Sequence, residues 1–532
     1  MACQQTAVSP TVWPTAILPS AVDEAMVEEL ATAVSPTVAL PEEKIKITAV
    51  SGTPTELITI LQAFVQNHPG QYEWVDAGEA DVVITPNGER PFAQWVYAVA
   101  APFATIQDNI TAEELRALWQ APATNTIPLF VQTNDLDGVS RLLGTAGENV
   151  QAVPLNLSEA VWAERLSLAI VPFDQLTPDL KVLTVDGNGP IQKAFNAAAY
   201  PLILRLGLAG EETAVNQFLA DWDGPSTNRD ASKMTTVAMT GVTAFVRATA
   251  FNMEQFGVLW PGEEVAPILQ QADIAHLSNE VSFDPECPYP NPIGGTSFCS
   301  SDAYFALIEN LSIDVIELTG NHLNDYGRIN VDHSMNMYED AGMQTFGGGR
   351  NLAEAARPAL FEHNGNKVAF VGCNDFGPTY AWATETDAGS RPCDDTMPAE
   401  ISGLNDEGYV VITTLQYAEF YHYAATEQQK LDFQALINAG ATAVSGSQGH
   451  HVQGFGLYNG GFIHYGLGNL FFDQMDQLGT RQTFVDVYTI YDGRLLNVDL
   501  WTGLIENYAR PRTMTPAERE QALRAVFQAS GW

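Results

Sequence analysis

The sequence predicts an α/β protein made of two α/β domains in series. Strand-like runs alternate with helix-like patterns between residues 43 and 225, and from about residue 235 polar clusters directly follow apolar runs. The length of 532 residues also exceeds what one hydrophobic core usually supports. We therefore expect a flexible N-terminus over 1–42, an α/β domain over 43–225, a linker over 226–234 and a second domain over 235–532.

Six runs in the first domain are typical of strands. They are KIKITAV, ADVVITP, WVYAVAAPF, TIPLFVQT, LSLAIVPF and LKVLTV. Between them, ELITILQAFVQNHP and ITAEELRALWQ carry apolar residues at helical spacing. This alternation predicts a mostly parallel sheet with helices on its faces. The polar stretch DGPSTNRDASKM, which begins at Asp223, has no periodicity and is typical of a linker.

The first domain resembles the type II periplasmic binding proteins, in particular the phosphate-binding branch. The resemblance depends on VYAVAAPFATIQDNITAEELRALW, LAIVPFDQLTPDLKVLTVDG and YPLIL. It implies a ligand between two lobes. The segment SGTPTEL, Ser51 to Leu57, is expected to open a helix whose free N–H groups could hold a small anion. The alternative is a threonine N-cap with nothing bound.

The chain is strongly acidic, with 24 basic residues against 64 acidic ones and a formal net charge of -40. Phosphate neutralisation needs clustered Lys and Arg, so a nucleic-acid partner is not expected. Electrostatic docking on anionic lipid is disfavoured for the same reason. The acidity itself favours solubility.

The N-terminus reads MACQQ, and the stretch up to about Leu40 is rich in Ala, Thr, Val, Ser and Pro. We interpret it as the remnant of a bacterial lipoprotein signal followed by a flexible stalk, with Cys3 as the lipid-bearing residue. No apolar run of about 18 residues is present, so a lipid on Cys3 is the expected membrane tether. These features predict an extracytoplasmic cell-surface protein.

The other four cysteines form two pairs that are close in sequence, Cys287 with Cys299 and Cys373 with Cys393. In an oxidising compartment they could form two local disulfides. The alternative is four free buried thiols. No CxxC pair occurs, which disfavours a cysteine-type zinc site.

Polar clusters in the second domain follow predicted strands, where ligand residues of open α/β folds gather. Glu280 offers a hard oxygen ligand, Asn321 a carbonyl oxygen and His450 an imidazole nitrogen. His322, next to Asn321, could donate a proton to a leaving group. A divalent ion held by such mixed ligands would polarise a phosphoryl oxygen or acidify a water molecule.

From about Thr236 to Ile490 the sequence resembles the CapA family of bacterial capsule and poly-gamma-glutamate synthesis proteins, within the calcineurin-like metallophosphoesterases. The family's ANNHxxDYG stands here as TGNHLNDYG, and its I-x-YSLGNFxFD as FIHYGLGNLFFD. AGMQTFGGGRNLAEAARP also fits. The resemblance implies an α/β/β/α sandwich, a site with metal ligands Glu280, Asn321 and His450, and His322 as the acid.

This sequence departs from the family at three expected metal ligands. The family's Gly-Asp pair is Gly241-Val242 here, and Gln416 and Gln448 stand where it has histidines. Three ligands with one charge are too few for a metal pair. We expect one weakly held divalent ion or, more simply, none. The two glutamines could serve a hard ion such as calcium, or could hydrogen-bond a substrate instead.

Two further residues complete the predicted substrate site, together with Gln416 and Gln448. Asp325 is expected either to bind substrate or to cap a helix that begins near Tyr326. Asn469 is expected to bind substrate or to tie its loop through side-chain hydrogen bonds.

Two functions compete at this point. In the first, the chain synthesises or processes an extracellular polymer, poly-gamma-glutamate, through a degenerate metallophosphoesterase-type site with reduced or altered catalysis. In the second, the CapA-like domain is a non-catalytic scaffold and the N-terminal domain binds a small anion or solute.

Overall fold

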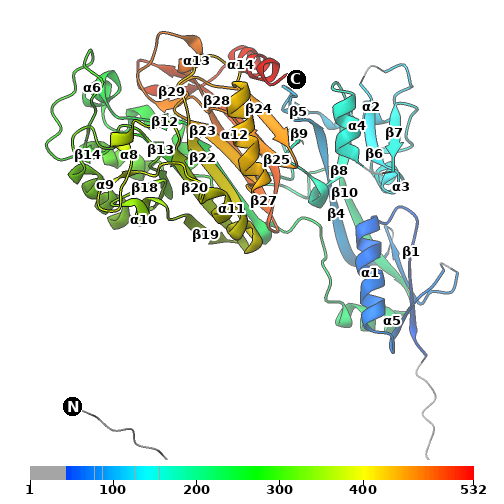
Figure 1. The fold of residues 1–532 in the computed structure, drawn as a ribbon. Helices are drawn as coiled ribbons and strands as arrows, with labels where there is room; N and C mark the ends of the chain where they lie inside the picture. The colour runs from blue at the N-terminus through cyan, green and yellow to red at the C-terminus, as the bar shows by residue number, and fades with distance from the viewer. Residues whose placement is uncertain (1–42, 77, 87, 126, 155) are drawn as a thin grey trace, which may run out of the picture. The chain divides into compact units, whose positions relative to one another are not determined.

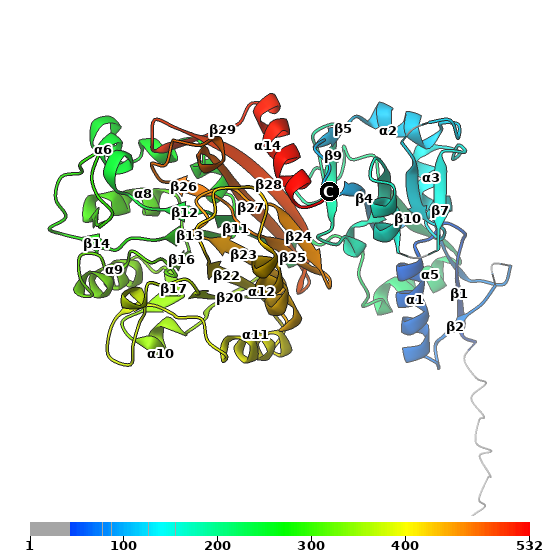
Figure 2. The same ribbon diagram turned by 45° about the horizontal axis from the view of Figure 1, so that its top comes forward.

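The computed structural model describes residues 43–532 except 77, 87, 126 and 155. Ile45–Trp532 forms one compact unit, shown in two views in Figures 1 and 2. Cys3 and the predicted stalk lie outside the described residues. Within the described part, every helix is too short or too polar to cross a bilayer.

The N-terminal half is built on a mixed ten-stranded sheet. Two parallel groups of three strands flank the long antiparallel strands β4 (Arg90–Pro102) and β10 (Ile203–Gly210). The first group is β2 (Tyr72–Trp74), β1 (Ile45–Ala49) and β3 (Val82–Thr85). The second is β8 (Leu168–Pro172), β6 (Leu129–Gln132) and β7 (Val150–Val153). The short strands β5 (Asn109–Ile110) and β9 (Leu180–Val185) lie off this order.

The helices of this half are amphipathic and bury apolar faces against the sheet. A Thr111–Glu114 capping box starts α2 (Ala112–Trp119). The first helix, α1, spans Thr55–Asn67, but its N-cap is Pro54 and no side chain caps it. The expected threonine cap is therefore wrong, because proline takes the position at which a hydroxyl would accept the first free N–H. The remaining helices are α3 (Leu136–Leu143), α4 (Leu157–Ala163) and α5 (Glu212–Asp221).

The predicted linker is anchored by one buried asparagine. Asn228 accepts a hydrogen bond from the Val96 N–H (2.8 Å) and donates one to the Val96 carbonyl (3.0 Å). Its side chain thereby mimics a neighbouring strand of β4. The backbone N–H of Asp230 donates to the Tyr491 hydroxyl (3.0 Å).

The second half contains two sheets that pack face to face. The larger, nine-stranded sheet runs β17 (Gln344–Phe346), β16 (Val315–Glu317), β13 (Ile274–Asn279), β11 (Met234–Thr240), β27 (Gln482–Tyr491), β28 (Arg494–Glu506) and β29 (Arg510–Thr513). Off this order, β12 (Val242–Thr243) pairs with β13, and β26 (Asn469–Phe471) pairs with β12. The six-stranded sheet runs β19 (Ala359–His363), β20 (Asn366–Asn374), β22 (Tyr409–Gln416), β23 (Ala443–Ser447), β25 (Gly461–His464) and β24 (Phe455–Tyr458).

Alternating side chains divide between the cores of these layers, as strand geometry requires. On β11, Val237 and Met239 enter the core between the sheets, whereas Ala238 faces the helices of the larger sheet. On β22, Ile412 enters the inter-sheet core and Val411 faces the opposite helices. The arrangement is an α/β/β/α sandwich, which confirms the predicted fold class.

Helices cover the outer face of each sheet. Figure 1 shows α11 (Met397–Asp406) and α12 (Glu427–Asn438) lying over the six-stranded sheet. On the other side, α8 (Phe305–Asn310) and α9 (Ile329–Asp340) pack on the larger sheet. The C-terminal helix α14 (Pro516–Ala529) contributes Val526 and Phe527 to the inter-sheet core. The other helices of this half are α6 (Arg247–Phe256), α7 (Ala266–Leu269), α10 (Leu352–Ala355) and α13 (Leu478–Arg481).

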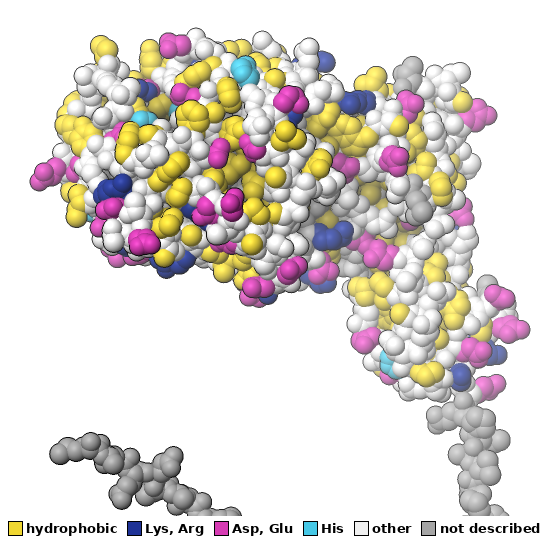
Figure 3. Space-filling model, in the orientation of Figure 1, with side chains coloured by type: hydrophobic (Ala, Val, Ile, Leu, Met, Phe, Trp, Pro, Cys, Tyr) yellow, Lys and Arg dark blue, Asp and Glu magenta, His cyan; other side chains and the backbone are white. Residues whose placement is uncertain are grey.

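Both local cysteine pairs are disulfides. Cys287 is bonded to Cys299, and Cys373 to Cys393. The disulfide alternative of the sequence analysis is therefore confirmed over free thiols. Acidic side chains are scattered over the face shown in Figure 3, with fewer basic ones between them.

Candidate functional site

The predicted site residues lie where strands of both sheets end. Glu280 follows β13 directly, Asn321 and His322 lie beyond β16, and Gln416 is the last residue of β22. The sheets are joined at this end by a hydrogen bond between the hydroxyls of Ser278 and Ser447 (3.0 Å). Parallel pairing of β13 with β16 and of β22 with β23 brings these carboxyl ends to one rim.

Glu280 and His322 form the first part of the site. The His322 Nε2 lies 3.6 Å from a Glu280 carboxylate oxygen, and its Nδ1 lies 2.6 Å from Oδ2 of Asp325. Glu280 is only 2% exposed, and neither of its oxygens has a hydrogen-bond partner. Gly320 makes this approach possible, because a Cβ there would lie 2.6 Å from Cα of Glu280.

The pKa of His322 is raised above its ordinary value. Burial favours the neutral ring and lowers the pKa, but the hydrogen bond with Asp325 and the charges of Glu280 and Asp325 outweigh that effect. When His322 is protonated, its Nε2 N–H faces Glu280.

An amide cluster forms the second part of the site. The Gln416 side-chain N–H₂ donates to the Asn321 Oδ1 (3.2 Å) and to the side-chain oxygen of Gln448. All three amides come from different strand ends and lie where the resemblance places metal ligands. The arrangement presents amide donors and acceptors, which suit a polar ligand with groups of the same kind.

His450 forms the third part. Its Nδ1 bonds to Oδ1 of Asn469 (2.8 Å), and its Nε2 lies 3.4 Å from a carboxylate oxygen of Glu419. Asn469 is fully buried, and its N–H₂ group donates to the carbonyls of His450 (3.0 Å) and Thr480 (3.1 Å). Asn469 therefore ties the loop and orients His450. It would affect a ligand indirectly, by positioning that histidine.

Aromatic rings connect these parts. Phe298 lies 4.4 Å from the ring of His322, and Phe472 stacks on His450 at 4.9 Å. The guanidinium of Arg247 lies over both phenylalanine rings, at 4.9 and 5.1 Å. Arg247 donates to the carboxylate of Asp473 from Nε and from one terminal nitrogen.

The backbone at the site is strained. Gln448 and His450 both have positive φ, 74° and 48°, and so does Arg247 at 45°. Side chains other than glycine rarely adopt this conformation, and such strain concentrates at functional sites. The local backbone thus turns Gln448 toward Gln416 and His450 toward Asn469.

The residues present do not fit a two-metal centre. Val242 is buried on β12, where the family's aspartate would stand, and has no ligand atom. Gln416 and Gln448 bond to each other and to Asn321, the amide that the sequence analysis expected as a ligand. Among residues 43–532, apart from the four undescribed positions, no group of three or more His, Cys, Asp and Glu is arranged to hold a metal ion.

The structure thus brings together Glu280, His322 and Asp325, and separately Asn321, Gln416 and Gln448 around the same rim, with His450 linked through the phenylalanines. The expected helix-capping role of Asp325 is wrong. The helix α9 begins at Ile329 after Arg328, whereas the Asp325 carboxylate bonds to His322 and accepts the Phe298 N–H (2.9 Å).

Two residues of the site were not predicted from the sequence. Glu419 and Tyr421 lie in the loop after β22, and the Tyr421 hydroxyl donates to Glu419 (2.8 Å). Burial, the hydrogen bond with Glu419 and the nearby charge of Glu280 raise the pKa of Tyr421 to about 12. Glu419 lies three residues beyond Gln416, the site residue at the end of β22. This position is the one feature of the sequence that indicates Glu419 as a site residue.

The segment Ser51–Leu57 has fewer free groups for an anion than its sequence implies, because Ser51 is already hydrogen-bonded within the protein. The Ser51 hydroxyl donates to the Asp137 carboxylate, and Arg141 donates to the Ser51 carbonyl (3.0 Å). Nearby, Tyr97 donates to the buried Asp135 (3.1 Å). Burial, only partly offset by that hydrogen bond, raises the pKa of Asp135 to about 6.

Comparison with known proteins finds a family model that matches part of the second half. The model of the family described as "Bacterial capsule synthesis protein PGA_cap" matches residues 236–474. We call these residues the PGA_cap domain. The PGA_cap domain so defined includes the strand ends that carry Glu280, Asn321, Gln416 and His450, and it ends before β27.

Curated relatives of the PGA_cap domain are distant. "Capsule biosynthesis protein CapA" of Bacillus anthracis is 24% identical over 257 residues, covering 47% of this chain and 62% of the relative. "PGA biosynthesis protein CapA" of Bacillus subtilis (strain 168) is 24% identical over 170 residues, covering 32% and 45%. The chain thus spans about half to three fifths of the length of these relatives.

Solved structures align with each half at low scores. An ABC-type phosphate transport receptor from Vibrio cholerae covers 34% of this chain and 95% of its own, with 14% identity and a TM-score of 0.29. A putative 5'-nucleotidase from Staphylococcus aureus covers 56% and 59%, with 13% identity and a TM-score of 0.34. At these scores neither likeness decides anything about the PGA_cap domain or its neighbour.

Proposed function

We propose that this chain is an extracytoplasmic, capsule-associated protein that binds poly-gamma-glutamate at the strand ends of its PGA_cap domain, with metal-dependent catalysis reduced or lost. The match to the family model and the similarity to two capsule biosynthesis proteins support the association with capsule polymer. Two disulfides support an oxidising compartment outside the cytoplasm. A lipid on Cys3 would tether the chain to the membrane.

One observation carries the proposal. The buried Glu280 carboxylate has no hydrogen-bond partner, and the amides of Asn321, Gln416 and Gln448 lie on the same rim. A buried acceptor without a donor is costly, so the site is completed by a ligand that donates. The repeated amide N–H and C=O groups of a glutamyl polymer can donate to Glu280 and pair with the glutamines.

The chemistry left to this chain's own residues is proton transfer and positioning. When His322 is protonated, the proton on its Nε2 could pass to a leaving atom or bond to a polymer carbonyl, while Asp325 holds the ring at Nδ1. Glu280 and Asn321 could at most share one weakly held hard ion with the glutamine oxygens. Polymer repulsion by the acidic surface would be offset locally by His322, whose pKa is raised.

Titration calorimetry of the full chain with γ-linked oligoglutamate tests the proposal. We expect binding by the natural chain and about tenfold weaker binding by the Gln416→Ala/Gln448→Ala variant. The control is Gln428→Ala, because Gln428 is an exposed glutamine of α12 whose amide bonds to Asp432 and not to the amide cluster. Equal affinity of all three proteins, or no binding by any, would overturn the proposal. Metal analysis of protein purified without chelators should give less than one ion per chain.

A second candidate function assigns ligand binding to residues 43–225, with the PGA_cap domain as a non-catalytic scaffold. A cavity beside β4 and β10 favours it, because Arg205 and Arg229 line that cavity and could bind an anion. In this case phosphate, sulfate or another small oxyanion should bind the full chain, and the Gln416→Ala/Gln448→Ala variant should bind equally well.

A further inference from the structure

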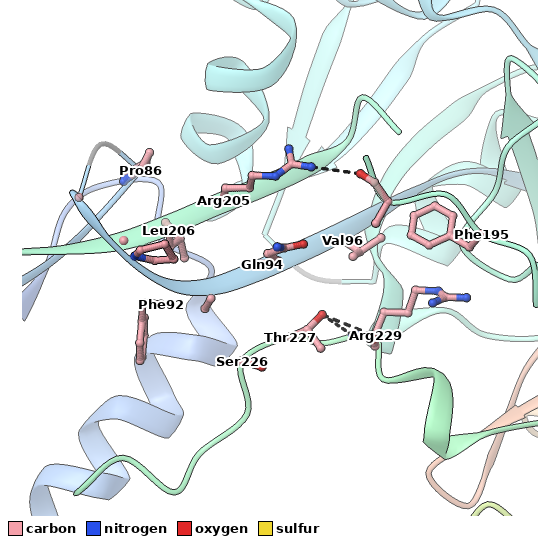
Figure 4. A pocket seen from close by; sticks show the side chains of 15 residues that line it. Pro86, Phe92, Gln94, Val96, Phe195, Arg205, Leu206, Ser226, Thr227 and Arg229 are labelled. Atoms are coloured by element: carbon pink, nitrogen blue, oxygen red, sulfur yellow. Dashed lines mark hydrogen bonds between the residues drawn. The ribbon is translucent and has the colours of Figure 1, made fainter. Parts of the chain in front are cut away.

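We propose that a cavity on strands β4 and β10 of the N-terminal half is a second binding site for a γ-linked glutamyl chain, which it holds by the pendant carboxylates. This inference depends on the proposed polymer-binding function and adds a site to it. The cavity has a volume of about 590 Å³ and is walled by β4, β10 and the segment 226–229 (Figure 4). That volume lies within the usual range of ligand pockets.

The cavity is cationic in an otherwise acidic chain. Arg205 and Arg229 line it, and no Asp or Glu does. Neither arginine has a carboxylate within ion-pair distance in the described part of the chain, whereas eight of the 17 arginines there have one. With 24 basic residues against 64 acidic ones, two arginines without a carboxylate partner on one cavity form a local site for an anion.

The arginines are held in place without losing all their donors. Arg229 donates from Nε to the Pro190 carbonyl (2.5 Å) and from one terminal nitrogen to the Gln192 carbonyl (2.9 Å), and it lies 4.5 Å from the Phe195 ring. Arg205 donates from one terminal nitrogen to the Ala197 carbonyl (3.1 Å). Each guanidinium has five N–H donors, so both keep donors for a ligand.

Burial lowers the pKa of Arg229 to about 10. This shows that its charge is partly desolvated without a compensating carboxylate. A bound carboxylate would supply the missing opposite charge, and charge-assisted hydrogen bonds of this kind are stronger than neutral ones.

The cavity differs from the surface that contains Ser51. The hydroxyl of Tyr97 bonds to Asp135. The same hydroxyl and the Gly52 carbonyl both lie close to Gly138, because a Cβ placed there would touch both atoms. Gln94 and Val96 line the cavity, and their side chains point to the other face of β4 from that of Tyr97, since neighbours along a strand alternate. The two surfaces therefore lie on opposite faces of β4.

The lining favours an organic carboxylate over a bare inorganic ion. Between the arginines lie apolar walls from Phe92, Phe195 and Leu206, with the Gln94 amide and the Ser226 and Thr227 hydroxyls as further polar groups. In Figure 4, Gln94 and Arg205 project from adjoining strands. A glutamyl unit combines a pendant carboxylate with methylene groups and amides, which matches all three kinds of lining.

The test is calorimetry of the full chain with γ-linked oligoglutamate and, separately, with inorganic phosphate. We expect Arg205→Gln to abolish one of two binding events or to weaken it at least about tenfold. Arg90→Gln is the matched control, because Arg90 lies on the same strand pair but does not line the cavity. It loses the same charge and should bind normally. If Arg205→Gln binds like Arg90→Gln, the inference is wrong.

A second variant separates folding from binding. Arg229→Lys keeps the charge but loses the paired donation to Pro190 and Gln192, so its thermal unfolding is recorded before its affinity. The Gln416→Ala/Gln448→Ala variant should keep the event that Arg205→Gln loses. If oligoglutamate binds only the PGA_cap rim, this inference fails while the proposed function stands. If phosphate competes fully with oligoglutamate at the cavity, an inorganic anion is its ligand and the inference fails.

Discussion

Nδ1 of His322 lies 2.6 Å from Oδ2 of Asp325, and the same carboxylate accepts the backbone N–H of Phe298 at 2.9 Å. Asp325 thus fixes both the histidine ring and the segment that packs against it. This pairing sets the proton on His322 and explains why the histidine faces Glu280 and not solvent.

Replacing Asp325 by Asn should lower the pKa of His322, because the ring loses a nearby negative charge that raises it. A raised pKa adds stability below the unfolded-state pKa, and that stability is lost as pH rises through the folded-state pKa. Asp325→Asn should therefore reduce stability most at acidic pH. NMR titration of the ring, assigned with His322→Gln, measures the shift. Asp302→Asn at the surface pair with His333 is the control and should leave His322 unchanged.

At pH values above the pKa of His322, Glu280→Gln should raise the melting temperature of the ligand-free protein. There the histidine is neutral and the buried carboxylate has no donor, so removing the charge relieves a cost of about 1–3 kcal/mol. The same variant should lose affinity for oligoglutamate. A lower melting temperature would mean that Glu280 is paired by a group other than a ligand.

Restoring the family's histidines should restore metal binding. Gln416→His/Gln448→His adds two imidazoles beside Glu280, Asn321 and His450, and mixed imidazole and carboxylate ligands suit zinc and manganese. Metal analysis after dialysis should show a higher content than in the natural chain. The variant Gln428→His, on the exposed face of α12, controls for adventitious binding to added histidines.

Removing the disulfide Cys287–Cys299 should destabilise the protein by about 3 kcal/mol, from the chain entropy of a loop of this length; its cysteines are 12 residues apart. It should also weaken oligoglutamate binding, because Cys299 adjoins Phe298, which lies on His322. Denaturant unfolding of Cys287→Ala/Cys299→Ala measures the first effect. Cys373→Ala/Cys393→Ala serves as the comparison, and unchanged binding in the first variant would show that Phe298 is held without the disulfide.

Asp135→Asn should stabilise the protein at neutral pH. Burial raises the pKa of Asp135 from 3.8 to about 6, so the folded state binds more protons between these values and stability falls as pH rises through that window. The variant avoids this loss, which is at most about 3 kcal/mol, and the gain should vanish below the lower value. Unfolding measured across pH checks both the sign and the window.

The arrangement of layers was predictable because the signals were local. Apolar runs that alternate with helical patterns predicted β1, β3, β4, β6, β8 and β9. The motif around His322 predicted the sandwich. The strand β10, Ile203–Gly210, was missed, since its two glycines and Arg205 break the apolar run. Its antiparallel pairing with β4 was not predictable either, because a strand's pattern carries no direction.

The site was predictable where a motif fixed it. Glu280, Asn321, His322 and Gln416 lie on one rim, as the resemblance implied. The contact of Glu419 with His450 was not foreseeable, because it depends on the path of an irregular loop after β22. The pairing of Asp325 with His322 was not predicted either, because an aspartate three residues after a histidine can equally cap a helix.

The strand β11 pairs along its whole length with β27, from Met234 opposite Tyr491 to Thr240 opposite Val485, although β27 begins beyond the residues matched by the family. A recombinant fragment cut at residue 474 would leave the main chain of β11 without its neighbour, and an open strand edge of this kind invites aggregation. Expression of this half in isolation should therefore retain the chain through α14.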